Sequence, residues 1–418
     1  MHWQKESNTN TYIKALAFFL NPTISLFLAL FSLKTKSSCV LLFAFFVTFG
    51  FSYTVSDVRT EENNLDGISY RNDFEEYANI SSETFYDSLA DYVTLQGGLD
   101  FYKDVVCYFV SRFTANYHVM FFVVSLVFSF FCLKSLKYFV TDKNFSNSIF
   151  CFILLYLFVS NQIFNINNFR FYTAAWIANF SLLKWLIDGN KKLLLLLFIT
   201  PFFHGSFILI PIMVIIYLFF CKSYRYLTIA FVLSLVFSEL SLEVFRNAIE
   251  YMPAESALAL KMSVYTDENY VYKINEGGSG FIWVVRLLEA FTRILINVLV
   301  LVLIVNYNKY IRHTNFQQLF HFMLLIMIFA NFTMFIPSTG NRFIILAMPL
   351  FAYIWLGCLL NTRNDKWLYL LGLLFVMQAT LPFAIYSFPC VRLYFRVLES
   401  SFFCSSPLWL FLKYILWF

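Results

Sequence analysis

The chain has 418 residues, of which 60% are hydrophobic, 21% are aromatic and only 13% are charged. Soluble domains are about half apolar and about a quarter charged, so a soluble protein of this composition would lack the polar surface needed to cover itself. The formal charge of +5 comes from basic residues that lie between apolar runs rather than in one patch, which argues against nucleic-acid binding. We therefore expect lipid to be the solvent for much of the chain.

Long apolar runs predict the fold class. A membrane-spanning helix needs about 20 mainly apolar residues, and the runs present predict an all-α, polytopic membrane helical bundle of about 10–12 transmembrane helices. We expect one transmembrane domain over residues 1–418. The clear candidates are 12–33, 38–56, 117–138, 147–164, 170–187, 226–246, 281–305, 317–336, 342–360 and 367–386.

Two segments leave alternatives open. The run 193–220 is interrupted by Pro201, Gly205 and Pro211, and it is either one kinked helix or a re-entrant pair of half helices. The tail 402–418 is either a further short span or a helix that lies in the membrane interface.

Lysine and arginine set the expected orientation, because cytoplasmic loops are enriched in both. All six basic turns can be cytoplasmic if the N-terminus is outside and the run 193–220 returns to the side that it left, which favours the re-entrant alternative. These turns contain Lys34 and Lys36; Lys134, Lys137 and Lys143; Lys191 and Lys192; Lys222 and Arg225; Lys309 and Arg312; Arg363 and Lys366.

The opposite face then receives two large segments. Residues 57–116 form an outer, periplasmic acidic loop, whose first part, 57–104, has twelve Asp or Glu against three Lys or Arg. Apolar residues at helical spacing over 100–113 predict an amphipathic helix along the outer interface. Residues 248–280 form a second outer loop.

Polar residues at the outer ends of spans are the candidates for chemistry, because charged groups near the membrane usually face a cavity or a partner. Arg170 and Arg342 each begin an apolar helix, where the helix N-terminus and the guanidinium both favour an anion. The alternative is that each arginine only anchors its helix by reaching lipid phosphates. The whole set is Asp57, Arg59, Arg112, Arg170, His204, Arg286, Arg293 and Arg342. For Arg286 and Arg293, an internal ion-pair cluster with Glu289 is an equally open alternative.

His204 lies well inside an apolar stretch, between Pro201 and Gly205. Non-helical backbone at that depth is tolerated where protein or a cavity covers it. We weigh a catalytic histidine against a structural one that bonds a freed carbonyl group. The eight cysteines and five histidines show no metal-ligand spacing, so we expect neither a metal nor another cofactor.

The order of short patterns resembles the EpsG/Wzy-type family of bacterial exopolysaccharide and O-antigen repeat-unit polymerases. A lysine turn and a second span lead to Asp57-Val-Arg59, followed by an Asn-rich turn into residues 169–174, Phe203-His-Gly-Ser206 and Asn341-Arg342-Phe343. The resemblance covers most of residues 12–360. Typical members have Gln where this chain has Phe171, so the neighbours of Arg170 differ from the family pattern.

The resemblance implies a membrane glycosyltransferase at the outer face of the bacterial inner membrane. Donor and acceptor would be oligosaccharide repeat units on undecaprenyl pyrophosphate, joined into capsular, exo- or O-antigen polysaccharide without a metal. Arg59, Arg170 and Arg342 would bind pyrophosphate or sugar, because arginine matches phosphate geometry. His204 or Asp57 would act as catalytic base. Expected partners are the two lipid-linked substrates, membrane lipids, a flippase and a chain-length regulator.

Two other functions remain alternatives. A lipid-linked oligosaccharide flippase or transporter also needs outer cations, but would be expected to show duplicated halves and intramembrane charge on both sides. A polysaccharide O-acyltransferase should place its acyl-donor site toward the cytoplasm, whereas the candidate residues face outward. A purely structural membrane subunit also stays open.

Overall fold

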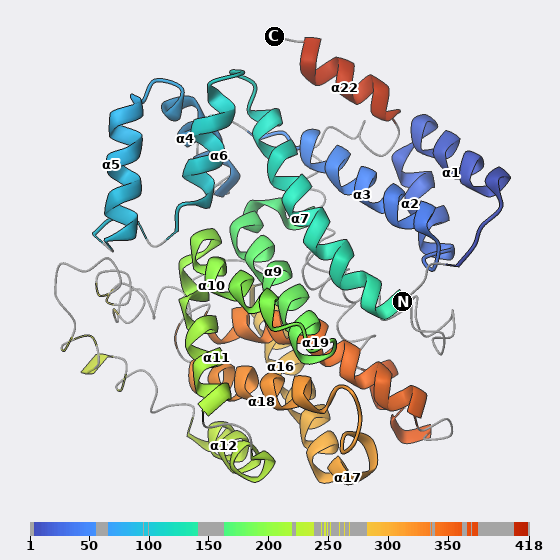
Figure 1. Ribbon diagram of the computed structural model, residues 1–418, viewed down its shortest axis with the longest axis vertical. Coiled ribbons are helices and arrows are strands. Elements are labelled where there is room, and N and C mark those ends of the chain that lie inside the picture. The colour runs from blue at the N-terminus through green and yellow to red at the C-terminus, as the bar shows by residue number, and fades with distance from the viewer. Residues whose placement is uncertain are drawn as a thin grey trace.

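A computed structural model describes residues 4–55, 66–140, 163–219, 223–237, 282–361, 366–374 and 405–416, apart from single positions inside these ranges and isolated residues between 244 and 267. Every regular element in this part is a helix (Figure 1). Two helices, Tyr117–Val140 and Thr339–Leu359, are long and apolar enough to cross a membrane, and shorter apolar helices accompany them. The predicted all-α membrane bundle is confirmed.

The first predicted span, 12–33, is two helices in the structure, α1 (Asn8–Leu20) and α2 (Pro22–Phe31). Asn21 separates them. Its side chain accepts hydrogen bonds from two backbone N–H groups at the start of α2, at 2.8 and 3.2 Å. Pro22 is suited to the first helical position because its missing N–H would be unpaired there. Local capping therefore breaks a run that is apolar enough to continue.

The two ends of this helical hairpin lie together. The backbone N–H of Gln4 donates to the carbonyl of Lys34 at 2.9 Å, and Gln4 pairs with Thr35 in an isolated parallel bridge. A single span over 12–33 would separate these residues by the membrane thickness. Residue 4 therefore lies beside the Lys34 turn, which argues against the expected N-terminus outside. The orientation expected from residue 36 onward does not depend on this point.

The centre of the bundle is α7 (Tyr117–Val140), which packs between α3 (Lys36–Phe51) and α9 (Phe169–Leu186). A Cβ atom on Gly50 of α3 would lie 1.6 Å from the Ser125 hydroxyl oxygen of α7. Glycine is therefore what lets these two helices approach.

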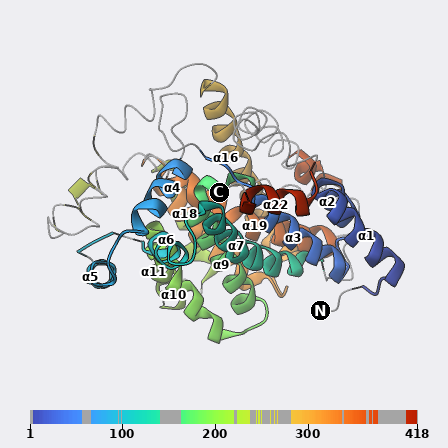
Figure 2. The same cartoon turned by 90° about the horizontal axis from the view of Figure 1, so that it is seen from above.

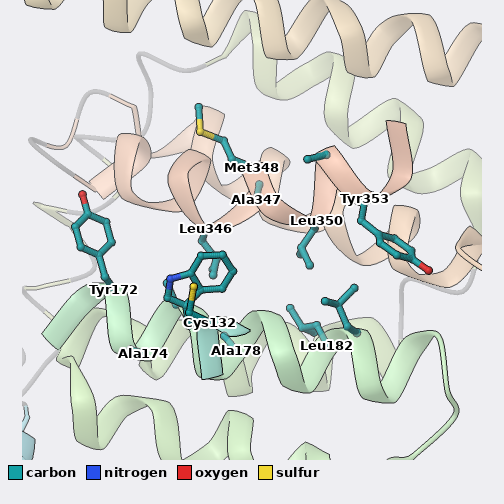
Figure 3. Packing of buried hydrophobic residues seen from close by; sticks show 14 of the residues in the cluster. Cys132, Tyr172, Ala174, Ala178, Leu182, Leu346, Ala347, Met348, Leu350 and Tyr353 are labelled. Atoms are coloured by element: carbon teal, nitrogen blue, oxygen red, sulfur yellow. The ribbon is translucent and has the colours of Figure 1, made fainter. Parts of the chain in front are cut away.

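Small residues also bring α9 against α19 (Thr339–Asn361). Figure 3 shows Ala174 and Ala178 of α9 facing Leu346 and Ala347 of α19, with both helices running in the same direction. All four residues are buried. The N-terminal heads of α9 and α19 therefore lie at the same end of the bundle.

Three helices of the predicted acidic loop gather at one end of the molecule, α4 (Asp66–Tyr77), α5 (Ser82–Val93) and α6 (Tyr102–Ser111) (Figure 1). We refer to this end as the α4–α6 end. Phe85 of α5 stacks on Tyr108 of α6 with ring centroids 3.8 Å apart, so the loop has a small core of its own. Helix α6 lies within 100–113, where the sequence predicts a helix.

The run 193–220 turns back on itself. It begins at the last residue of η2 (Lys191–Leu193) and contains α10 (Leu194–Phe203), η3 (Gly205–Ile208) and α11 (Leu209–Phe219). The ring of Phe207 lies 5.3 Å from that of Phe171, at the head of α9, whereas Tyr217 lies 5.8 Å from Trp185, near its other end. The structure therefore supports the re-entrant pair: α10 runs back to the head of α9, and α11 returns.

A buried amide pair joins the second half of the bundle, α12 (Tyr224–Val236), α16 (Ile282–Val305) and α18 (Gln317–Phe332). Asn297 and Asn331 exchange hydrogen bonds of 3.1 and 3.0 Å, and Asn331 also donates to Ser234. The short helix α17 (Tyr307–Tyr310) follows α16.

The C-terminal helix α22 (Pro407–Leu416) returns to the N-terminal helices, as Figure 2 shows. Phe411 stacks on Phe51 at 4.4 Å, and Asn116 donates to the carbonyl of Tyr414 at 2.6 Å. The tail therefore lies across the end of α3 and α7 that faces α4–α6. Most of the predicted spans 147–164 and 367–386 and most of the loop 248–280 lie outside the described residues.

Candidate functional site

The head of α9 is held by the Asn-rich turn before it, η1 (Ile163–Asn168). The side-chain oxygen of the buried Asn167 accepts hydrogen bonds from the Tyr53 hydroxyl and, at 3.2 Å, from the backbone N–H of Gly67. A Cβ on Gly67 would come within 2.6 Å of that oxygen, so glycine is required for this contact. The turn thus fixes the start of α9 relative to α3 and α4.

Arg170 at this head is paired with a residue from the acidic loop. Its Nη1 lies 2.8 Å from Oδ1 of Asp100, and its Nε donates to the Tyr70 hydroxyl at 3.3 Å. The Asp100 side chain is only 6% exposed and that of Arg170 is 27% exposed, so this ion pair is largely shielded from water. Burial raises the pKa of Tyr70 above its ordinary value, so its phenol stays protonated and neutral.

Asp100 also reaches the re-entrant segment. Its second oxygen, Oδ2, accepts the backbone N–H of Gly205 at 3.3 Å. One residue further on, the backbone N–H of Phe101 donates to the carbonyl of Phe202 at 3.0 Å. The start of α6 is thereby fixed to the end of α10, and Asp100 connects Arg170 to the turn at His204.

His204 stands at the break between α10 and η3, in an extended backbone conformation. Its Nδ1 lies 2.8 Å from the Ser206 hydroxyl and 3.3 Å from the Ser206 backbone nitrogen. Its ring packs edge-on against Phe171, with centroids 5.5 Å apart. The imidazole therefore lies beside the head of α9.

Arg342 comes from the head of α19. A Cβ on Gly340 would lie 2.7 Å from the Ala330 carbonyl oxygen, so this glycine permits the close approach of α19 to α18. The next residue, Asn341, donates to Glu289 of α16 at 3.3 Å. The Arg342 guanidinium carbon lies 5.9 Å from the centroid of the Phe171 ring. Within the described part of the chain, that guanidinium has no ion pair or hydrogen bond.

The structure thus brings together three residues that the sequence singled out, Arg170, His204 and Arg342. Phe171, where the family pattern has Gln, contacts both of the last two. Asp57 and Arg59 lie outside the described residues. Arg170 and Arg342 are not equivalent, since the first is neutralised by a carboxylate and the second is held against an aromatic ring.

Arg112, by contrast, has a structural contact. Its guanidinium donates to the carbonyls of Ala78, at 3.2 Å, and of Ile80, beyond the end of α4. Cations near the last carbonyls of a helix are favoured, so Arg112 caps α4. The side chain of Arg286 lies outside the described residues. Arg293 makes no ion pair with a described residue.

Sequence reasoning missed Asp100 and Tyr70 as partners of Arg170. A second carboxylate, Asp104, pairs with Lys103, whose Nζ lies 2.7 Å from Asp73 of α4. Burial raises the pKa of Asp104, although Lys103 opposes this effect. This ion-pair group joins α4 to α6 and supports the segment that begins at Asp100.

The tyrosines of the predicted acidic loop are mostly used in packing. Tyr92 stacks on Phe101 at 5.8 Å and Tyr102 lies 4.4 Å from Phe203, whereas Tyr86 is 58% exposed. Among the described residues, no group of three His, Cys, Asp or Glu side chains is placed to hold a metal.

These features define a helical membrane protein whose candidate site, with two arginines, lies where a re-entrant segment meets two helix N-termini. The EpsG family model matches residues 37–396, and the chain belongs to the EpsG family. Comparison with curated proteins and with solved structures gave no match.

Proposed function

We propose that the protein is a membrane glycosyltransferase that polymerises oligosaccharide repeat units carried on undecaprenyl pyrophosphate into a capsular, exo- or O-antigen polysaccharide. The observation that carries the proposal is the position of Arg342. Its guanidinium has no carboxylate partner among the described residues and lies next to the heads of α9 and α19. Both a guanidinium and a helix N-terminus favour a phosphate-type anion.

The proposed reaction joins two lipid-linked units. An acceptor hydroxyl oxygen attacks the anomeric carbon of the donor sugar, and the bond from that carbon to the diphosphate oxygen breaks. The lipid diphosphate leaves with the electron pair, and the hydroxyl proton passes to a base. Positioned cations accelerate such a step because the leaving oxygen gains charge in the transition state. Arg342 supplies that charge, and Arg170, oriented by Asp100, lines the same site.

The function is tested with purified protein in lipid vesicles that contain a defined undecaprenyl-diphosphate-linked repeat unit. We expect oligomers on the lipid and one undecaprenyl diphosphate released for each new linkage, both measured by mass spectrometry. Movement of the intact unit across the bilayer without new linkages would favour the flippase instead.

The proposed site faces the outside of the bacterial inner membrane. In a variant whose native cysteines are replaced, a thiol reagent that cannot cross the membrane should label a cysteine introduced at Ser82. The same reagent should miss cysteines at Asn190 and at Asn8, which lies near the Lys34 turn. All three positions are exposed, so access depends on the side of the membrane. Labelling at Asn190 but not at Ser82 would overturn the orientation.

A further inference from the structure

Arg293 lies in the first half of α16 and has a half-buried side chain. Among the residues that the structure describes it forms neither an ion pair nor a hydrogen bond, so the pair with Glu289 that the sequence left open is absent. A charged group in a membrane helix is costly, and such groups usually face a cavity or a partner. An anion bound at Arg293 would supply the missing counter-charge.

The surface of α16 shows that Arg293 is not on its lipid-facing side. Successive residues of an α-helix point about 100° apart around the axis. Four exposed apolar residues share one side of α16: Leu287, Phe291, Ile294 and Val298. Arg293 points about 100° or more away from each of these four, but lies within about 60° of the buried Ile296 and Val300. An arginine that only reaches lipid phosphates would be expected beside the lipid-facing row.

Two hydrogen-bonded contacts define what this side of α16 faces. Glu289, four residues before Arg293, accepts the Asn341 amide of α19 at 3.3 Å. Asn297, four residues after Arg293, exchanges hydrogen bonds with Asn331 of α18. Four residues change the direction by only about 40°, so Arg293 lies between these two contacts, both along α16 and around it. Because helix side chains lean toward the N-terminus, its guanidinium extends toward the start of α19.

The start of α19 separates Arg293 from Arg342. Asn341 faces α16, whereas the next residue, Arg342, contacts Phe171 of α9. Consecutive helix residues point about 100° apart, so the two arginines approach one helix N-terminus from different sides. A guanidinium and the free N–H groups of a helix N-terminus both favour a phosphate-type anion. The geometry thus provides two positions for an anion, one on each side of the α19 head.

The proposed reaction requires two lipid diphosphates at the same time, because the donor and the acceptor are each carried on one. We propose that Arg293 binds the diphosphate of the acceptor, while Arg342 binds that of the donor. The inference rests on the proposed function and deepens it. Arg342 belongs to the donor because it contacts the same Phe171 ring as His204, beside Arg170 at the head of α9.

The two arginines should therefore act at different stages of the reaction. The donor diphosphate gains charge as the bond to the sugar breaks, so Arg342 stabilises the transition state. The acceptor diphosphate keeps its charge throughout. An interaction that is equally strong in the ground state and the transition state changes KM without changing kcat, and this is the effect that we expect of Arg293.

Two substrate analogues separate the donor from the acceptor. The donor is a lipid-linked repeat unit whose acceptor hydroxyl is methylated, so that it can only give its sugar. The acceptor is a lipid-linked unit with a methylene group in place of the anomeric oxygen, so that it can only receive. Each turnover makes one new linkage. Its rate in phosphatidylcholine vesicles is measured by mass spectrometry while one substrate is varied and the other is saturating.

We expect Arg293→Gln to raise the KM for the acceptor about tenfold or more, since charge-assisted hydrogen bonds to phosphate are lost. The KM for the donor and kcat should stay within about threefold of the unaltered values. The amount of folded protein should not change, because no ion pair among the described residues is broken. Arg293→Lys keeps the charge and should give an intermediate KM. Arg225→Gln, at an exposed position near the start of α12, is the matched control and should change neither KM.

The outcomes distinguish this inference from the proposed function. An unchanged KM for the acceptor in both Arg293 variants would mean that Arg293 meets only lipid headgroups or water, and the inference alone would fail. A raised KM for the donor, or a loss confined to kcat, would place Arg293 at the donor and also overturn it. If the unaltered protein forms no linkage, either from the analogues or from the unmodified unit, the proposed function itself fails.

Discussion

Replacing Arg342 with lysine should remove most polymer formation and leave the amount of folded protein unchanged. The guanidinium is half-buried against Phe171 and bonds no described carboxylate, so its loss breaks no ion pair among the described residues. A lysine ammonium keeps the charge but cannot form the two parallel hydrogen bonds that arginine makes to a phosphate. Loss of such a positioned donor costs about 100- to 1,000-fold in rate. Polymer length by gel electrophoresis, beside protein level, measures the effect.

Arg225→Lys is the matched control for Arg342→Lys. Arg225 is exposed near the start of α12, close to Lys222 and on the expected cytoplasmic side, and it has no bonded partner in the described part of the chain. Its replacement should leave polymer unchanged. Full polymer from Arg342→Lys would make Arg342 a lipid anchor, the alternative that its position at a helix head left open.

Hydropathy alone could predict the class of the fold, but it could not place every break in it. The window from 12 to 33 is apolar on average, yet Asn21 caps α2 and the chain reverses there. An average over about 20 residues hides one polar capping residue. At His204 the break was visible, because Pro201 and Gly205 disrupt the helix and the basic turns required a return. The positions of the breaks therefore follow from capping residues and from the charge pattern, not from mean hydropathy.

The candidate site was predictable where a residue is exceptional in its own segment. Arg170 and Arg342 are charged residues at the heads of long apolar helices, and His204 lies inside an apolar stretch, which made all three visible. Asp100 is one of twelve acidic residues between 57 and 104, so nothing local distinguishes it from its neighbours. Only the tertiary contact across 70 positions of sequence separates it from them.

The stability of the folded protein should depend strongly on the Asp100–Arg170 pair. Arg170→Gln should destabilise the protein much more than Asp100→Asn does. The carboxylate is 6% exposed and the guanidinium 27% exposed, so loss of the arginine leaves a charge that water reaches poorly. Loss of the aspartate leaves a cation that is partly hydrated. Removing one partner of a buried ion pair costs about 3–5 kcal/mol when the charge that remains is buried. Because Arg170 is partly exposed, we expect a cost toward the lower end of that range.

The double variant tests whether the pair, rather than either residue alone, is responsible. If Arg170→Gln destabilises because it leaves a buried carboxylate, adding Asp100→Asn removes that charge and should restore about 1–2 kcal/mol of the loss. The Asn amide oxygen can still accept the Gly205 N–H, so the turn at His204 keeps its contact. Thermal unfolding in detergent of the single and double variants gives the coupling energy.

Glu75→Gln, which breaks the exposed Arg71–Glu75 pair, is the control and should cost about 0.5 kcal/mol or less. Additive losses in the double variant would mean that Asp100 and Arg170 act independently, and that Asp100 does not hold the arginine in place.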